Sequence, residues 1–370
     1  MTRLLPTVFA TLLAYLPVIA SADLPATLKG QLWSTLTIGD DPAPDYARHE
    51  ELIGYIPTFS LGRELAGGAL IDLEWAYRAG WATTGNDSTV SSGSHHRLWA
   101  RYSGPSLELR LGLQKIAFGP GRVLRPLAWF DTIDPKDPTN QTDGVEAFRA
   151  RWFPTGDLAL WGWLVNEGDM AEVSPGGRLE LSLPWADLGL TLHSNRTTEL
   201  GQIGLLPAFL QAPEWRLGWD LRMDRGIGFW TEGMLAYPVK PAMMGPKYQH
   251  VVMLGGDYTF ALGNGLYVMA EHLWLRPLRW PLSNQGQVSA LLASVPFGIM
   301  DQLMAIVQID WESRRAFNYL RWARAWDAIS LNVMLQANPR RKSFDLLPES
   351  LPTGLAGFGA GLQITVVYNH

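Results

Sequence analysis

Two absences set the first limits on this chain. The sequence of 370 residues contains no cysteine. It therefore has no disulfide framework, no thiolate metal site and no attachment motif for a c-type haem. Beyond the N-terminal segment the most apolar stretch, 288–300, is short and is interrupted by Pro296, whereas a transmembrane helix needs about 20 apolar residues. We therefore do not expect the mature chain to cross a membrane as helices.

Charge is also scarce. Charged residues make up 18% of the sequence, and the formal net charge is -5. A nucleic-acid partner would require a basic surface, so none is expected. Aromatic residues are abundant instead, with 17 Trp, 11 Tyr and 13 Phe. Many stand near the ends of apolar runs, as the aromatic girdles of a membrane barrel do.

The N-terminus has the pattern of a secretory signal peptide. One positive charge precedes an apolar run at 4–19, and the small residues at 20–22 form a cleavage site. Pro6 and Pro17 interrupt the run, which disfavours the alternative of a retained membrane anchor. We expect 1–22 to be removed, and the protein to be exported from the cytoplasm.

The rest of the chain alternates between apolar and polar side chains. Between 68 and 81 apolar residues occupy every second position, while Asp72, Glu74 and Arg78 occupy alternate ones. This period predicts a β-strand with one apolar and one polar face. The pattern recurs in eighteen segments: 27–38, 49–63, 68–79, 95–103, 106–118, 144–153, 157–166, 176–183, 188–197, 214–224, 226–238, 248–261, 265–275, 287–296, 300–312, 316–323, 327–337 and 355–368.

The segments between these strands alternate in length. Bacterial barrels have short periplasmic turns and long outer loops, and the long segments here are 39–48, 80–94, 119–143, 167–175, 198–213, 239–247, 276–286 and 338–354. Lipid requires every backbone polar group to be paired. We therefore expect an all-β fold in which 23–370 form one transmembrane antiparallel up-and-down β-barrel. Eighteen strands is the preferred count, and sixteen follows if weak segments within 316–337 merge. A soluble β-sandwich or propeller is the alternative.

The polar positions are expected to face the lumen. A barrel of 16 to 18 strands is wide enough for an aqueous channel. The predicted pore-lining residues are Asp72, Glu74, Arg78, Arg97, Arg101, Arg110, Gln114, Arg149, Arg151, Asp220, Arg222, Glu271 and Asp310. The first half of this set is rich in arginine and the later part in carboxylates. These charges either create a field across the pore or pair locally.

The segment 119–143 differs from an ordinary loop. It contains Leu124, Trp129 and Phe130, which is more apolar surface than a solvated loop exposes. A loop of this length is usually functional, and we expect it to fold into the barrel lumen.

This region resembles a known group of proteins. LGLQKIAFGPGRVL at 111–124, with WFDTIDPKDP after it, is similar to a pattern in the alginate-export and phosphate-selective porin groups. The position of the loop, between the fifth and sixth strands, resembles that of the third outer loop of bacterial general porins, which forms a constriction. The resemblance implies that the constriction residues are Arg122, Arg125, Asp131, Asp134 and Asp137.

The three aspartates leave two roles open. Carboxylates are ligands for Ca²⁺, and they also pair with arginine. Pro135 and Pro138 would hinder wrapping around an ion, which favours pairing with Arg122 and Arg125.

These features predict a porin in the outer membrane of a Gram-negative bacterium, which passes small hydrophilic solutes of anionic or sugar-like character. Its partners would be outer-membrane lipid and solutes, with a homo-oligomer or a periplasmic partner left open. Two alternatives remain. The barrel could sheath a multi-haem cytochrome from another chain, or it could be an outer-membrane hydrolase. Its histidines are scattered, and His95 and His96 at a predicted loop end fit a solvated loop or a metal site. No enzyme, cofactor or metal is predicted.

Overall fold

The structure is a computed structural model, and it describes residues 25–42, 47–84, 88–166, 173–196, 202–203, 206–207, 213–239, 248–277, 286–342 and 357–370. The predicted signal peptide lies outside these residues, as do large parts of the predicted loops at 198–213, 239–247, 276–286 and 338–354. No helix in the described part is long and apolar enough to cross a membrane.

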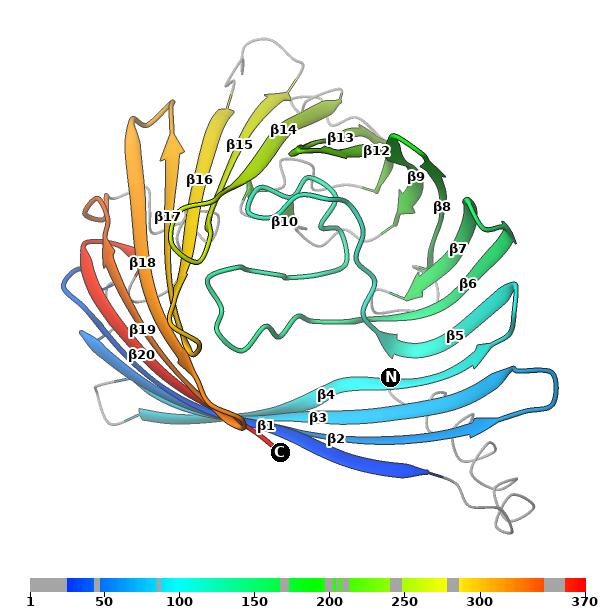
Figure 1. Cartoon of the computed structure of the whole chain (residues 1–370), viewed down its shortest axis with the longest axis horizontal. Helices are drawn as coiled ribbons and strands as arrows, with labels where there is room; N and C mark the ends of the chain where they lie inside the picture. The colour runs from blue at the N-terminus through cyan, green and yellow to red at the C-terminus, as the bar shows by residue number, and fades with distance from the viewer. Residues whose placement is uncertain are drawn as a thin grey trace.

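Eighteen strands in this part of the chain form one antiparallel sheet that closes on itself. Each strand pairs with its neighbours in sequence, and β1 pairs with both β2 and β20, which closes the ring (Figure 1). Two further short strands, β10 (Gln202–Ile203) and β11 (Leu206–Pro207), pair with each other between β9 and β12.

The bounds of the barrel strands are as follows: β1 (Ala26–Gly39), β2 (His49–Glu64), β3 (Leu70–Thr84), β4 (Ser88–Ser103), β5 (Leu107–Gln114), β6 (Val145–Thr155), β7 (Leu158–Asn166), β8 (Val173–Leu183), β9 (Ala186–Asn195), β12 (Glu214–Arg225), β13 (Ile227–Pro238), β14 (Gln249–Phe260), β15 (Leu266–Pro277), β16 (Gly286–Phe297), β17 (Asp301–Asp310), β18 (Arg315–Ala325), β19 (Ile329–Ala337) and β20 (Ala360–Asn369). The predicted fold and the count of eighteen are confirmed.

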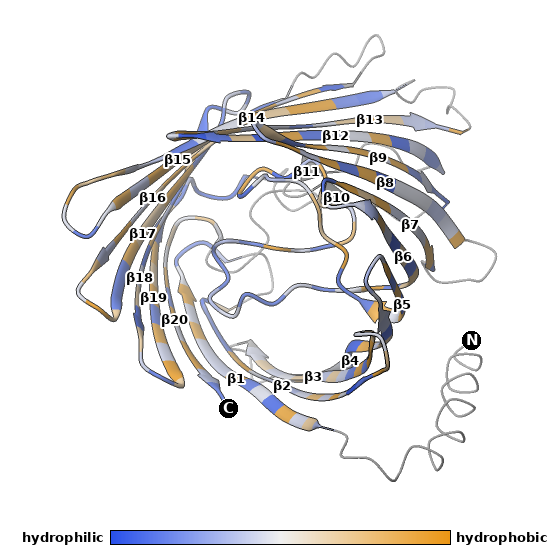
Figure 2. Cartoon of the chain, turned by 45° about the vertical axis from the view of Figure 1, so that its right-hand side comes forward, coloured by the Kyte–Doolittle hydropathy of each residue, from blue (hydrophilic) through white to orange (hydrophobic). Residues whose placement is uncertain are grey.

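The period of two decides which side chains face inward. On β12, Trp215 and Leu217 are exposed on the outer face, whereas Arg216 and Asp220 are buried on the inner face. The same alternation of apolar and polar residues runs along the strands in Figure 2. An apolar outer face and a polar inner face are what a bilayer and an aqueous lumen require.

Both chain ends lie at the end of the barrel that carries the short turns. Connections at this end include 104–106, 156–157 and Gly226, and the opposite end carries connections such as 115–144 and 338–359. Near the C-terminus the backbone of His370 exchanges hydrogen bonds with Gly30. The first and last strands are therefore joined at the short-turn end.

One predicted loop is wrong. The segment 80–94 was expected to be a long loop, but β3 and β4 extend to within three residues of each other, at 85–87. Glycine, serine and threonine dominate this segment, and small polar residues resemble loop composition. Their backbones nevertheless pair across the hairpin, and the hydroxyls of Thr83 and Thr89 lie 3.3 Å apart.

The fifth strand is shorter than predicted. The alternation continues to 118, yet β5 ends at Gln114. Ile116 and Phe118 continue the apolar pattern, but they are buried among side chains inside the barrel instead of on the outer face. The segment that leaves the sheet is therefore 115–144.

Candidate functional site

The segment between β5 and β6 lies within the ring of strands in Figures 1 and 2. It departs after Gln114, whose side-chain amide donates to the carbonyl of Ala147 on β6 at 2.9 Å. Two residues earlier, Gly112 has a φ of 115°, a conformation that residues with a Cβ rarely adopt. A Cβ there would also overlap the carbonyl oxygen of Leu98. The start of the segment therefore depends on a glycine.

We divide this segment into a wall lobe, 116–131, and a crossing lobe, 132–143. The wall lobe packs on β7 and β9 through aromatic rings. Phe118 stacks with Trp163 at a centroid distance of 5.9 Å, and Phe130 contacts His193 edge-on at 5.0 Å. Trp129 approaches Gly218 on β12, where a Cβ would meet its ring. Aromatic pairs of this kind contribute about 0.5–1.5 kcal/mol each beyond the area they bury.

Two buried carboxylates hold the backbone of the wall lobe. Glu271 on β15 accepts the N–H groups of Arg122, Val123 and Leu124 at 2.7, 2.9 and 2.7 Å, and the indole N–H of Trp230 at 3.1 Å. Glu232 on β13 accepts the backbone N–H groups of Gly121 and Leu127. Both side chains are almost completely buried. Glu271 was predicted to line the pore, and the structure uses it as an anchor for this segment.

An ion pair closes the wall lobe on itself. Arg125 donates to both carboxylate oxygens of Asp131, and both residues are buried. This is one of the pairings that the sequence left open. The others are not formed, because Asp134 pairs with Lys136 at 3.6 Å, and Asp137 accepts from Thr139. Arg122 points an exposed side chain elsewhere.

The crossing lobe reaches strands far from β5. The guanidinium of Arg321 on β18 donates to the carbonyl of Pro135 at 3.4 Å, and Lys136 lies 4.8 Å from the ring centre of Tyr319. On its return, Gln141 donates to the side chain of Gln31 on β1 at 2.7 Å. The segment thus contacts opposite sides of the barrel.

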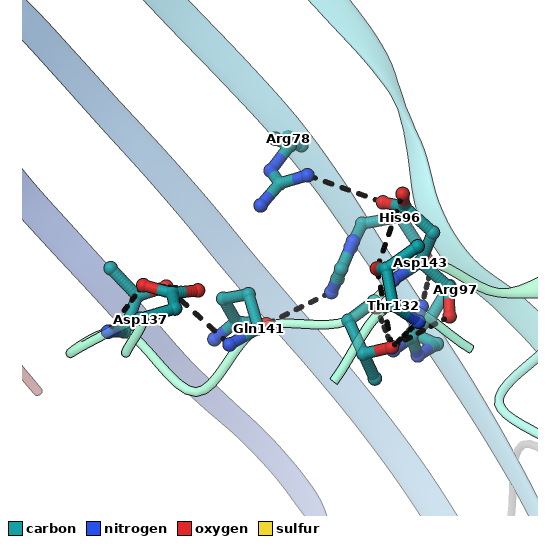
Figure 3. Close-up of polar contacts among 9 residues, drawn as sticks. Arg78, His96, Arg97, Thr132, Asp137, Gln141 and Asp143 are labelled. Carbon is teal, nitrogen blue, oxygen red and sulfur yellow. Dashed lines mark hydrogen bonds and ion pairs between the residues drawn. The ribbon is translucent and has the colours of Figure 1, made fainter. Parts of the chain in front are cut away.

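The last residues of the crossing lobe are bound by β3 and β4 (Figure 3). Arg78 pairs with Asp143 at 3.3 Å, the ring Nε2 of His96 lies 3.0 Å from the side-chain oxygen of Gln141, and Arg97 donates to the carbonyl of Thr142 at 2.6 Å. His96 was predicted to lie at a solvated loop end, which is wrong. A register shift of β4 against β3 near Ala76 places it in the strand, where it is buried.

An arginine array lies on the inner face of β4, β5 and β6. Arg101 is the cross-strand neighbour of Arg110, and Arg110 is the neighbour of Arg149. Like charges in such positions repel each other. Carboxylates offset part of this repulsion, since Asp72 accepts two hydrogen bonds from Arg101 at 2.9 and 2.7 Å, and Glu108 accepts one from Arg149 at 2.6 Å.

Indole rings offset more of it. Arg110 lies 4.4 Å from the ring centre of Trp99, and Arg151 lies 4.0 Å from that of Trp161. Both contacts have the geometry of a cation–π interaction. The inner face of β3 to β6 carries six arginines against three carboxylates, namely Arg78, Arg97, Arg101, Arg110, Arg149 and Arg151 against Asp72, Glu74 and Glu108. This face remains basic after local pairing.

The other predicted pore-lining residues are engaged in separate contacts. Glu74 accepts from the indole of Trp99, Asp220 pairs with Arg178, and Arg222 pairs with Asp224, while Asp310 accepts backbone N–H groups of the turn after β17. Sequence reasoning did not single out Glu232, Trp163 or His193. The charge of Glu232 on a lumen-facing position was a signal for it, whereas nothing local distinguished the other two.

No group of three or more histidine, aspartate or glutamate residues suited to a metal ion occurs in the described part of the chain. The aspartates considered as Ca²⁺ ligands are separated in the structure, because Asp131 faces Arg125 and Asp134 faces Lys136. The arrangement is that of a large barrel whose interior holds a folded segment and many charged side chains.

The fold and this interior define a porin-like β-barrel. The chain is similar to the crystal structure of Pseudomonas aeruginosa OccK5 (OpdH), with a TM-score of 0.59 at 11% identity, over 94% of this chain and 98% of that one. It is also similar to a triple mutant of the Rhodopseudomonas blastica porin, with a TM-score of 0.51 at 11% identity, over 94% and 100%. No protein-family model and no curated protein matches the sequence. The predicted resemblance to porins is confirmed for the fold.

Proposed function

We propose that this protein is an outer-membrane channel through which small hydrophilic solutes diffuse, and that the segment 115–144 is its constriction. The observation that carries the proposal is the binding of this segment across the barrel, from Glu271 on β15 to Arg321 on β18 and Gln31 on β1. A segment anchored at so many points narrows the lumen without depending on a partner. The similar structures include proteins named as porins, which supports the same function.

The basic inner face of β3 to β6 supports a preference for anionic or sugar-like solutes. Arginine donates several hydrogen bonds in a fixed plane and suits carboxylates, phosphates and hydroxyl-rich solutes. A basic surface within low-dielectric walls also raises the local concentration of anions. We assign Arg101, Arg110, Arg149 and Arg151 to this surface, and Arg125, Asp131, Asp134 and Asp137 to the constriction.

The same contacts favour a channel over the two alternatives. A sheath for a cytochrome needs an empty interior, and here the segment 115–144 occupies it. A hydrolase needs a nucleophile beside a base. Within the described residues His96 contacts Gln141, and His272 contacts Ser289 at 2.7 Å on the outer, lipid-facing side of β15 and β16. A serine there faces lipid and not an aqueous lumen.

Export and membrane insertion complete the proposal. Residues 1–22 act as a cleaved signal peptide, and 23–370 form one barrel domain in the outer membrane of a Gram-negative bacterium. The short-turn end, with both termini, then faces the periplasm, and the long connections face outward. The lipid bilayer and the solutes are its partners, while a homo-oligomer or a periplasmic partner would be added to these.

Planar bilayers test the channel directly. Purified protein is expected to give discrete conductance steps, and deletion of 132–142 with a short glycine linker is expected to raise the conductance of each step. Removal of the crossing lobe widens the lumen but leaves all eighteen strands intact. A silent barrel that copurifies with a haem protein would contradict the proposal and favour a sheath. Lipid hydrolysis by the silent barrel would favour the hydrolase.

A further inference from the structure

A recess lies between the wall lobe and the inner face of β12 to β16. Its volume is about 760 Å³, and it is bounded on one side by the segment 117–122 and on the other by strands of the barrel wall. The lining residues that matter here are Arg122, Ile133, Asp257, Tyr267, Met269 and Leu292. It is separate from the arginine array, which lies on β4 to β6.

One free positive charge faces this recess. The side chain of Arg122 is exposed and makes no hydrogen bond or ion pair with any residue that the structure describes. Two nearby carboxylates are already engaged, because Asp131 is bound by Arg125 and Asp224 is bound by Arg222 at 2.9 Å. The backbone of Arg122 is nevertheless fixed by Glu271, so its guanidinium is held at the recess instead of moving with a solvated loop.

One negative charge without an ion pair faces the same recess. Asp257 on β14 accepts a hydrogen bond from the hydroxyl of Tyr267 at 2.8 Å. It has no arginine, lysine or histidine within ion-pair distance in the described chain. The hydroxyl of Tyr267 fixes one carboxylate oxygen and leaves the other available for a donor.

The floor between these charges is apolar. Met269 and Leu292 point inward from β15 and β16 and are buried, and Ile133 of the crossing lobe adds an exposed apolar side chain. The lumen wall of an aqueous barrel is normally polar. A methionine at such a place adapts its shape to different apolar groups. The recess therefore offers a cation, an anion and an apolar floor to one solute.

We propose that this recess binds zwitterionic solutes with an apolar body, the class to which apolar α-amino acids belong. The carboxylate of the solute pairs with Arg122, its ammonium group pairs with Asp257, and its side chain covers Met269 and Leu292. A simple monoanion would leave Asp257 without a partner, and a simple amine would leave Arg122 without one. The inference rests on the proposed channel function and narrows its solute class.

L-leucine is the probe, with three solutes that each lack one feature. Glycine lacks the apolar body, 4-methylpentanoate lacks the ammonium group, and 3-methylbutylamine lacks the carboxylate. Flux of each is measured in proteoliposomes that contain the full chain. Binding of each to detergent-solubilised protein is measured by saturation-transfer NMR, a readout that does not require passage. We expect saturable leucine flux, linear glycine flux, and weaker binding of the two solutes with one charge.

Two conservative variants test the charges. R122Q and D257N are each expected to lower leucine binding and its flux at low concentration about threefold or more, the effect of losing one partly solvent-exposed charged hydrogen bond. Glycine flux at high concentration should not change. Arg63→Gln and Asp157→Asn, exposed residues outside the recess, are the matched controls. M269Q is expected to weaken leucine and leave glycine unaffected.

The outcomes separate this inference from the channel itself. Leucine that binds no better than glycine, or 4-methylpentanoate that competes as well as leucine does, would overturn the zwitterion site while an open conductance leaves the channel proposal intact. Unchanged leucine binding in both charge variants would overturn it as well. A barrel that passes neither salt nor glycine would refute the channel, and the NMR measurement would still decide whether the recess binds leucine.

Discussion

Replacing Glu271 by glutamine is expected to release the backbone of the wall lobe from the barrel wall. The carboxylate accepts four N–H groups, three from the backbone of 122–124 and one from Trp230. Glutamine keeps one acceptor oxygen and places a donor NH₂ against the remaining N–H groups. Two of the four donors therefore lose their acceptor.

The magnitude follows from this count. A buried donor without a partner costs about 1–3 kcal/mol, so two of them weaken docking of the lobe by about 2–6 kcal/mol, less the relief from no longer burying a charge. A change of about 1.4 kcal/mol is tenfold in an equilibrium constant. The undocked population should therefore rise at least tenfold. The barrel itself should remain closed, because its hydrogen bonds run between strands.

Two measurements check this prediction. Hydrogen exchange at the amides of 121–124 should accelerate in E271Q, while amides of β15 keep their protection. In bilayers the variant should show a noisier and higher open conductance than the wild-type protein. E64Q, an exposed carboxylate at the end of β2, is the control. Unchanged exchange at 121–124 together with unchanged conductance would refute the role of Glu271 as an anchor.

Two further predictions follow from the barrel wall. The double substitution R110Q with R149Q should shift the reversal potential in a salt gradient toward cation preference, since it removes two of six arginines from a basic face, and Arg63→Gln should leave it unchanged; an identical shift in both would argue against the array. Gly112→Ala should destabilise the folded barrel by roughly 1–3 kcal/mol, because the positive φ is strained for alanine and its Cβ would meet Leu98. Urea titration of the heat-modifiable band on a gel measures this loss, and a midpoint equal to that of wild type would contradict it.

Periodicity carried most of the fold prediction. A strand that faces lipid on one side must alternate, so the bounds of strands such as β12, predicted at 214–224 and found at 214–225, were accessible to simple counting. The errors fell where alternation and structure diverge. Composition misled at 80–94, where small polar residues pair as a hairpin, and alternation misled at 115–118, where apolar residues pack inside the barrel.

The candidate site was only partly predictable. The apolar content of 119–143 indicated that this segment needs cover, and the carboxylates and arginines indicated pairing. Partner choice was beyond the sequence, because Arg125 found Asp131 six residues away whereas Arg122 found its backbone partner, Glu271, on a distant strand. Nothing local distinguishes these two arginines.

The sequence by itself determined the closed barrel, the number of strands and the face on which each charge lies, since a period of two and alternating turns follow from backbone geometry alone. Tertiary structure decided which charges meet. Glu232 and Glu271 became anchors for backbone N–H groups, and Arg122 and Asp257 came to line one recess, although 135 positions separate them in the sequence. Such contacts depend on the path of a segment through the lumen, and closure of the ring is what brings its partners within reach.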